Sequence, residues 1–112
     1  MAQYIGMKFI KTALYLNAIK KARILAADEN KAIEELRVNP LAGDIIPHSG
    51  GFRKLRVAVE SRGKRGGARF IYFYIVKDST VYLVMAYKKN QKINLTSAEL
   101  KVLAKLAKEL GR

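Results

Sequence analysis

The sequence has no cysteine and only one histidine, His48. Without cysteine the chain has no disulfide scaffold, no thiolate metal site and no cysteine nucleophile. A single imidazole excludes zinc sites built from several histidines, and that one side chain would have to serve any Ser-His-Asp triad. The sequence therefore predicts an activity that uses no metal and no other cofactor.

Long hydrophobic runs are also missing. The longest apolar stretches, residues 70–76 and 81–87, have seven residues each, whereas a membrane-spanning helix needs about 20. Residues 1–11 lack the long apolar core and the small-residue cleavage site of a signal peptide. We therefore expect a cytoplasmic protein with no membrane partner, and the length of 112 residues predicts a single domain over residues 1–112.

Acidic residues are scarce. The chain has 22 Lys and Arg against 9 Asp and Glu, which gives a formal net charge of +13. Residues 51–92 alone hold eleven basic and two acidic residues, so this segment carries +9 of that charge. Such a concentration in one segment favours a surface that binds a polyanion over an ordinary solvated face.

Helical patterns occur at both ends of the chain. Apolar residues at helical spacing predict helices over residues 13–24 and 28–38, and Pro40 ends the second. The pattern Thr-x-x-Glu at residues 96–99 is a capping box, because the two side chains can each bond a free backbone N–H. It predicts a last helix that runs to about residue 110.

Strand patterns occupy the start and the middle of the chain. A weak alternation predicts a strand over residues 6–11, and stronger alternation or β-branched and aromatic residues predict strands over 52–59, 68–76 and 80–87. The last two form a hairpin. The element order predicts an α+β fold, with an antiparallel sheet of about four strands, a two-helix N-terminal hairpin and a C-terminal helix.

Three segments between residues 39 and 96 resemble the RelE/HigB family of type II toxin-antitoxin toxins. They are NPLAGDIIPHSGGFRKLRVA, GKRGGARFIYFY and VYLVMAYKKNQKINLT, in the same order and spacing as in the family. The resemblance implies a RelE-like fold that is similar to small microbial ribonucleases, and a toxin that enters the ribosomal A site and cleaves mRNA. It also implies a cognate antitoxin as partner, either a DNA-binding helix-turn-helix protein or an acidic protein.

Site residues follow from the same motifs. The resemblance implies catalytic roles for Lys54, Arg56, Arg69 and Lys89, and alternation along the strand places Lys54 and Arg56 on one face. The other cationic or aromatic residues near these motifs are predicted to bind RNA: Arg53, Arg62, Lys64, Arg65, Tyr87, Lys88 and Lys92. Arg62, Lys64 and Arg65 lie in a glycine-rich loop, residues 60–67, and are expected to attract RNA over a distance.

Two features depart from the family pattern. Relatives have PGTGG where this chain has PHSGG at residues 47–51, so His48 is either a loop residue or a general acid or base. Relatives of the RelE branch place a functional tyrosine after the last basic cluster, and residues 90–96 contain none. The tyrosines of the predicted strands either stack on bases or pack in the core: Tyr72, Tyr74, Tyr82 and Tyr87.

Two other functions remain open at this stage. ParE-like toxins of the same superfamily poison gyrase without cutting RNA, so the fold alone does not decide between the two activities. A basic RNA-binding or ribosome-binding module would need the charge but no catalytic group. The basic strand pair, the Gly-x-Arg strand start and the YKKN segment favour the nuclease.

Overall fold

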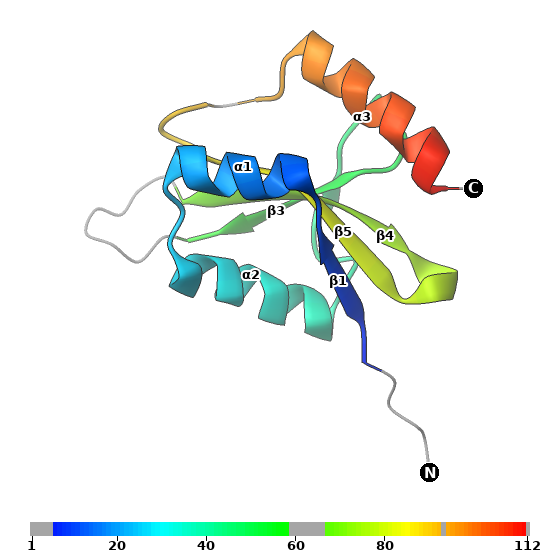
Figure 1. Ribbon diagram of the computed structural model, residues 1–112, viewed down its shortest axis with the longest axis horizontal. Coiled ribbons are helices and arrows are strands. Elements are labelled where there is room, and N and C mark those ends of the chain that lie inside the picture. The colour runs from blue at the N-terminus through cyan, green and yellow to red at the C-terminus, as the bar shows by residue number, and fades with distance from the viewer. Residues whose placement is uncertain (1–5, 59–66, 93, 112) are drawn as a thin grey trace.

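The computed structural model describes residues 6–58, 67–92 and 94–111. Its strands form one five-stranded sheet in the order β1-β5-β4-β3-β2 (Figure 1). The elements follow the chain as β1 (Lys8–Lys11), α1 (Ala13–Ala22), α2 (Ala26–Val38), β2 (Asp44–Ile45), β3 (Arg53–Val57), β4 (Ala68–Ile75), the short 3-10 helix η1 (Val76–Asp78), β5 (Thr80–Lys88) and α3 (Ser97–Leu110).

The predicted α+β class is confirmed, with two differences in the sheet. It has five strands where we expected about four, because Asp44 and Ile45 in the turn-rich connection pair antiparallel with β3. In addition, β1 pairs parallel with β5, so the sheet is mixed. The Thr12 amide and hydroxyl both donate to the Leu83 carbonyl, at 3.2 and 2.9 Å, and this fixes the register where β1 turns into α1.

The helices cover opposite faces of the sheet. Figure 1 shows α1 and α2 as two antiparallel helices joined by a short turn, as the sequence predicted. Both pack on one core, whose largest members are Tyr15, Leu36, Phe70, Tyr72 and Leu83. The second core lies under α3 and contains Phe52, Ile71, Val84, Leu103 and Ala107. Among the described residues, none of the helices is long and apolar enough to cross a membrane.

Tyr15 ties the two N-terminal helices together. Its ring is fully buried, and its hydroxyl donates to Glu29 Oε2 of α2 at 2.8 Å. Lys11 Nζ lies 3.1 Å from the same carboxylate oxygen. Burial, and then the neighbouring Glu29, raise the pKa of Tyr15 far above its usual value, so the hydroxyl keeps the proton that it donates.

A β-bulge interrupts the pairing of β4 with β5. Ile71 pairs with Met85, but the next residue, Tyr72, pairs with Leu83, so Val84 has no partner in β4. Val84 and Met85 consequently both belong to the core under α3. The bulge reverses the alternation along the second half of β5, and it brings Tyr87 onto the α3 side of the sheet.

Candidate nucleic-acid interface

Three adjacent strands place Arg56, Arg69 and Tyr87 in one row across the α3 side of the sheet. Arg56 of β3 is the direct partner of Arg69 of β4, and Arg69 is the direct partner of Tyr87 of β5. Directly opposed residues project from the same face of a sheet, with Cβ atoms about 4.5–5.5 Å apart. The sheet therefore concentrates two guanidinium groups and a phenol that are up to 31 positions apart in the sequence.

Lys54 lies on the same face, one row away. It is two residues before Arg56 in β3 and pairs with Ile71 of the α3-side core. Lys54 and Arg56 also line a hollow of about 380 Å³ between β2, β3 and the start of α3. The predicted juxtaposition of Lys54 and Arg56 on one face is thus what the structure shows, and both side chains reach the surface because α3 covers only the neighbouring part of the sheet.

Arg69 is the most enclosed cation of the row. Only 9% of its surface is exposed, and its strand partners on the two sides are Arg56 and Tyr87. Burial, and then the positive charge of Arg56, lower the pKa of Arg69, while Tyr87 acts in the opposite sense. Two like charges on directly paired strand residues repel each other, and guanidinium groups have the geometry to bind phosphate oxygens.

Tyr87 is buried beneath the segment that leads into α3. It is 5% exposed, and within the described ranges its hydroxyl has no hydrogen-bond partner. Burial raises the pKa of Tyr87, whereas Arg69 lowers it and Glu99 raises it. Lys92 Nζ lies 5.6 Å from the centre of the ring, within cation–π range. Tyr87 is therefore part of the cationic row and not a surface platform for stacking bases.

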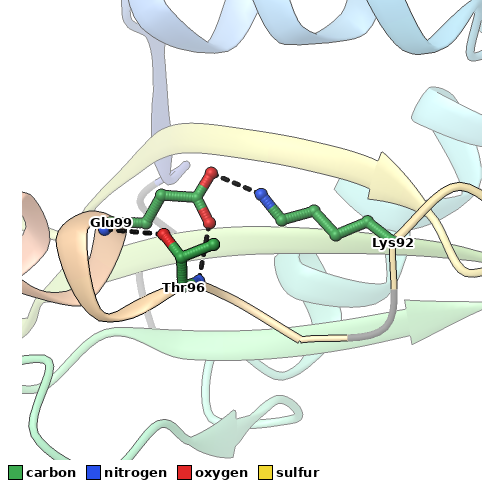
Figure 2. Close-up of polar contacts among 3 residues, drawn as sticks. All are labelled: Lys92, Thr96 and Glu99. Carbon is green, nitrogen blue, oxygen red and sulfur yellow. Dashed lines mark hydrogen bonds and ion pairs between the residues drawn. The ribbon is translucent and has the colours of Figure 1, made fainter.

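Lys92, Thr96 and Glu99 connect the start of α3 with the segment that follows β5 (Figure 2). Thr96 and Glu99 form the predicted capping box: the Thr96 hydroxyl accepts from the Glu99 amide at 3.1 Å, and Glu99 Oε1 accepts from the Thr96 amide at 2.9 Å. The other Glu99 oxygen pairs with Lys92 Nζ. Burial raises the pKa of Glu99, but the bonds from Lys92 and Thr96 outweigh it, so the pKa lies below its ordinary value.

Replacing Glu99 by glutamine should remove the ion pair and leave the capping box, because an amide oxygen can still accept from the Thr96 amide. The lowered pKa of Glu99 in the folded chain stabilises the protein above the pKa that this group has when unfolded, about 4.3. That contribution is lost as the pH falls through the folded pKa. We expect Glu99→Gln to lower the free energy of unfolding by up to about 1 kcal/mol at neutral pH and by less near pH 3.

Urea unfolding at the two pH values measures both differences. Glu109→Gln is the matched control, because Glu109 is an exposed carboxylate of the same helix and forms no ion pair among the described residues. An equal loss of stability from Glu99→Gln at both pH values would show that the ion pair with Lys92 contributes nothing.

The other predicted RNA-binding and catalytic residues do not join this row. Arg53 points to the opposite face and donates to the Gly43 carbonyl at 2.7 Å, so it secures the turn before β2. Lys88 pairs with Ala68, whose side chain belongs to the core under α1 and α2. Lys89 is exposed just after β5. Three predicted RNA-binding residues lie outside the described residues: Arg62, Lys64 and Arg65.

His48 and the remaining tyrosines have distinct surroundings. His48 is exposed, lines the hollow beside Lys54, and has a left-handed backbone with φ of 63°. Tyr72 is fully buried; its hydroxyl donates to the Pro40 carbonyl at 2.7 Å and accepts from the Gly43 amide at 2.9 Å. Tyr72 therefore has a structural role, and the partly buried Tyr74 and Tyr82 pack against the two cores.

Sequence reasoning missed the polar residues of the hollow, chiefly Asp44 and Asn94. One signal was available, because Asp44 is the only acidic residue between positions 36 and 59, the segment that also contains the basic strand. In the described part of the chain, no three His, Asp or Glu side chains converge in a group that could hold a metal ion.

The fold and this face define a small basic α+β protein whose sheet carries clustered cations on the α3 side. The model of a protein family described as the RelE toxin of the RelE / RelB toxin-antitoxin system matches residues 7–112. The chain therefore belongs to the RelE toxin family and is a toxin of a type II toxin-antitoxin system.

Two solved structures have the same fold. One is the RelBE2 toxin-antitoxin complex of Mycobacterium tuberculosis, with a TM-score of 0.54, 21% identity, and coverage of 75% of this chain and 99% of that one. The other is the E. coli toxin RelE in the free state, carrying two arginine-to-alanine substitutions. It has a TM-score of 0.55 and 16% identity, and the match covers 91% of this chain and 97% of that one.

Proposed function

We propose that this toxin is a ribosome-dependent endoribonuclease that cleaves mRNA in the A site. The observation that carries the proposal is the row of Arg56 and Arg69 across adjacent strands, with Lys54 beside it on the same open face. Arginine presents a planar fork that matches two phosphate oxygens, and lysine adds a compact charge. The membership of the RelE family supports the same class of reaction.

The proposed reaction is attack by the 2′-hydroxyl of a ribose on its own 3′-phosphate. The new O–P bond forms as the bond to the 5′-oxygen of the next nucleotide breaks, and the 2′-hydroxyl proton leaves while the 5′-oxygen gains a proton. Arg69 and Arg56 stabilise the additional negative charge on the phosphorane, and Lys54 holds the phosphate between the row and the hollow. The Tyr87 hydroxyl is the titratable O–H group in the row itself.

In this mechanism the ribosome orients the RNA for cleavage. Lysine and arginine are poor bases at neutral pH, because their ordinary pKa values lie above 10. Orientation of the 2′-hydroxyl in line with the breaking bond can supply a large part of the missing rate. A site rich in cations and poor in neutral-range bases is therefore suited to RNA that another particle holds in the reactive geometry.

The proposed partner in the resting state is a cognate antitoxin, which covers the α3 side of the sheet with acidic side chains. The net charge of +13, the exposed Arg56 and the partly exposed Lys54 favour an acidic covering segment. A toxin of the same fold has been solved in complex with its antitoxin. The pair would act in the cytoplasm, where the ribosomes are.

The test is a reconstituted translation reaction that contains a reporter mRNA, with and without an inhibitor of initiation. We expect the mRNA to be cut at codon positions only while it is translated. Inhibition of gyrase supercoiling without mRNA cuts would identify a ParE-like activity. Binding to ribosomes without either effect would identify a non-catalytic RNA-binding module, and each of these two results would overturn the proposal.

Binding to RNA should depend steeply on salt. If Lys54, Arg56 and Arg69 each contact one phosphate, the slope of log affinity against log salt concentration for single-stranded RNA is roughly −2, at about −0.7 per contact. Arg56→Ala should flatten this slope by about 0.7. Lys77→Ala is the matched control, because Lys77 is an exposed cation in the distant η1 turn. Fluorescence anisotropy with a labelled oligonucleotide measures the slopes, and equal slopes for all three proteins would exclude this face.

A further inference from the structure

The turn before β3 has a fixed shape at the edge of the hollow. Ser49 is fully buried, and its hydroxyl donates to the Ile46 carbonyl at 2.7 Å and accepts from the Phe52 amide at 3.0 Å. The Ile46 amide donates to the Phe52 carbonyl at 2.9 Å, and Gly50 packs against α3. These contacts fix the backbone around His48, so its imidazole projects from a well-supported part of the fold.

His48 has a backbone conformation that is unfavourable for its residue type. Its φ of 63° lies in the left-handed region, which glycine adopts freely and asparagine tolerates. The side chain is exposed, and among the described residues it forms no hydrogen bond or ion pair that would offset this cost. Strained residues of this kind cluster at functional sites. The imidazole therefore contributes little to the fold and calls for a role outside it.

His48 shares the hollow with the cations of β3. The residues that line this hollow of about 380 Å³ include His48, Lys54, Arg56 and, from β2, Asp44. The segment before α3 and α3 itself contribute uncharged side chains to the wall. The charged groups described around the imidazole are therefore two cations and one carboxylate. A phosphate bound by Lys54 and Arg56 would lie next to the imidazole, because all three side chains line one small hollow.

Proton transfer at neutral pH needs a group of suitable basicity. Of the side-chain types described around the hollow, only imidazole has an ordinary pKa near neutrality, about 6.5. Lysine and arginine keep their protons at this pH, and a carboxylate is a weaker base because its ordinary pKa is about 4. In the cationic row, burial raises the pKa of Tyr87, so the phenol also keeps its proton. His48 is thus the side chain of this face that is suited to accept a proton.

We propose that His48 is the general base of RNA cleavage by this toxin, an inference that rests on the proposed function. The imidazole takes the proton of the 2′-hydroxyl while that oxygen forms its bond to phosphorus. The bond from phosphorus to the 5′-oxygen breaks, and this oxygen takes a proton from water, which leaves a cyclic 2′,3′-phosphate. The Asp44 carboxylate stabilises the imidazolium, which then returns its proton to the solvent.

His48→Gly and His48→Asn test this role, since both replacements suit a left-handed backbone and neither side chain can act as a base. We expect each variant to cleave mRNA about a hundredfold more slowly in single-turnover reactions on programmed ribosomes. The melting temperature should equal or exceed that of the wild type, because the backbone strain is relieved. A full rate in either variant would overturn the proposal.

Ser79→Gly is the matched control for the change of backbone. Ser79 is another residue other than glycine with a positive φ, 48°, and it lies at the end of η1. The substitution relieves the same kind of strain at a turn that the cleavage reaction does not use. Its rate of cleavage should match that of the wild type.

Two further measurements distinguish proton transfer from a structural role. At acidic pH the wild-type rate should rise about tenfold per pH unit and then become constant, whereas the rate of His48→Gly should be nearly independent of pH. Free imidazole in the buffer should restore part of the rate of His48→Gly and leave the wild type unchanged. Parallel pH profiles without rescue by imidazole would overturn the proposal.

Because His48 is the only histidine of the chain, NMR can follow its imidazole signals without ambiguity. The free toxin is titrated with pH in the absence and presence of a short 2′-deoxy oligonucleotide, which this reaction cannot cut. A phosphate held beside the ring should move the midpoint of the imidazole titration upward by about half a pH unit. An unchanged midpoint with the oligonucleotide bound would overturn the proposed position of the base.

The cleavage reactions separate a failure of this inference from a failure of the proposed function. Cuts made at the wild-type rate by His48→Gly keep the nuclease and overturn the general base. No cleavage by the wild type on translating ribosomes overturns both.

Discussion

Arg69→Ala is expected to lower the rate of translation-dependent mRNA cleavage by about a hundredfold or more. One positioned donor to a developing anion commonly contributes about 2.7–4 kcal/mol to the transition state. Arg69 is placed for this role, since β-pairing on both sides fixes its backbone and 9% exposure restricts its side chain. Growth of cells that express the variant and single-turnover cleavage on programmed ribosomes are the two measurements.

The loss must be separated from unfolding, because Arg69 is enclosed and packs among three strands. Arg69→Gln keeps much of the side-chain volume and removes the charge, so it should lose nearly as much activity with a smaller change in melting temperature. Lys77→Ala in the η1 turn should keep full activity. Full toxicity in a folded Arg69→Gln variant would show that the cationic row is not the catalytic centre.

Gly50→Ala is expected to destabilise the fold by about 2–5 kcal/mol. Gly50 has φ of +85°, and a Cβ there would lie 2.7 Å from the Ala107 Cβ of α3. The left-handed backbone costs about 1–2 kcal/mol for a residue with a side chain, and the steric overlap against α3 adds about 1–3 kcal/mol. Urea unfolding of the two proteins measures the difference.

Gly6→Ala is the control for this substitution, since a Cβ at Gly6 would meet nothing within 4 Å. Its stability should match the wild type within about 0.5 kcal/mol. If Gly50→Ala is equally stable, α3 must move away from the turn without cost. In that case the side of the hollow formed by α3 would not be held by the turn at residues 47–51.

Local patterns predicted most elements of the fold. The β4–β5 hairpin follows from its β-branched and aromatic residues, and the start of α3 follows from Thr96 and Glu99, whose reciprocal bonds depend on residues three positions apart. The parallel pairing of β1 was not predictable in this way. It depends on contacts between Thr12 and Leu83, 71 positions apart, which no local pattern encodes.

The candidate site also combines features that local patterns predicted with features that depend on long-range contacts. Alternation within β3 was sufficient to predict that Lys54 and Arg56 share a face, because the period of a strand is two. Alternation could not assign Tyr87, since the unpaired Val84 reverses the phase of β5 before it reaches that residue. Alternation also places Arg53 and Arg56 on opposite faces, but it could not show that Arg53 supports a turn through its bond to the Gly43 carbonyl.

The sequence by itself determined the charge, the class of fold, the family resemblance and the strand that bears the basic pair, because each of these is a property of composition or of neighbours in the chain. Only the tertiary structure determined which cationic side chains lie next to one another. Sheet pairing brings Arg56, Arg69 and Tyr87 into one row, and the approach of β2 and of the segment before α3 places Asp44 and Asn94 in one hollow. These arrangements depend on the strand register and on the position of α3. Long-range contacts of the folded chain determine both.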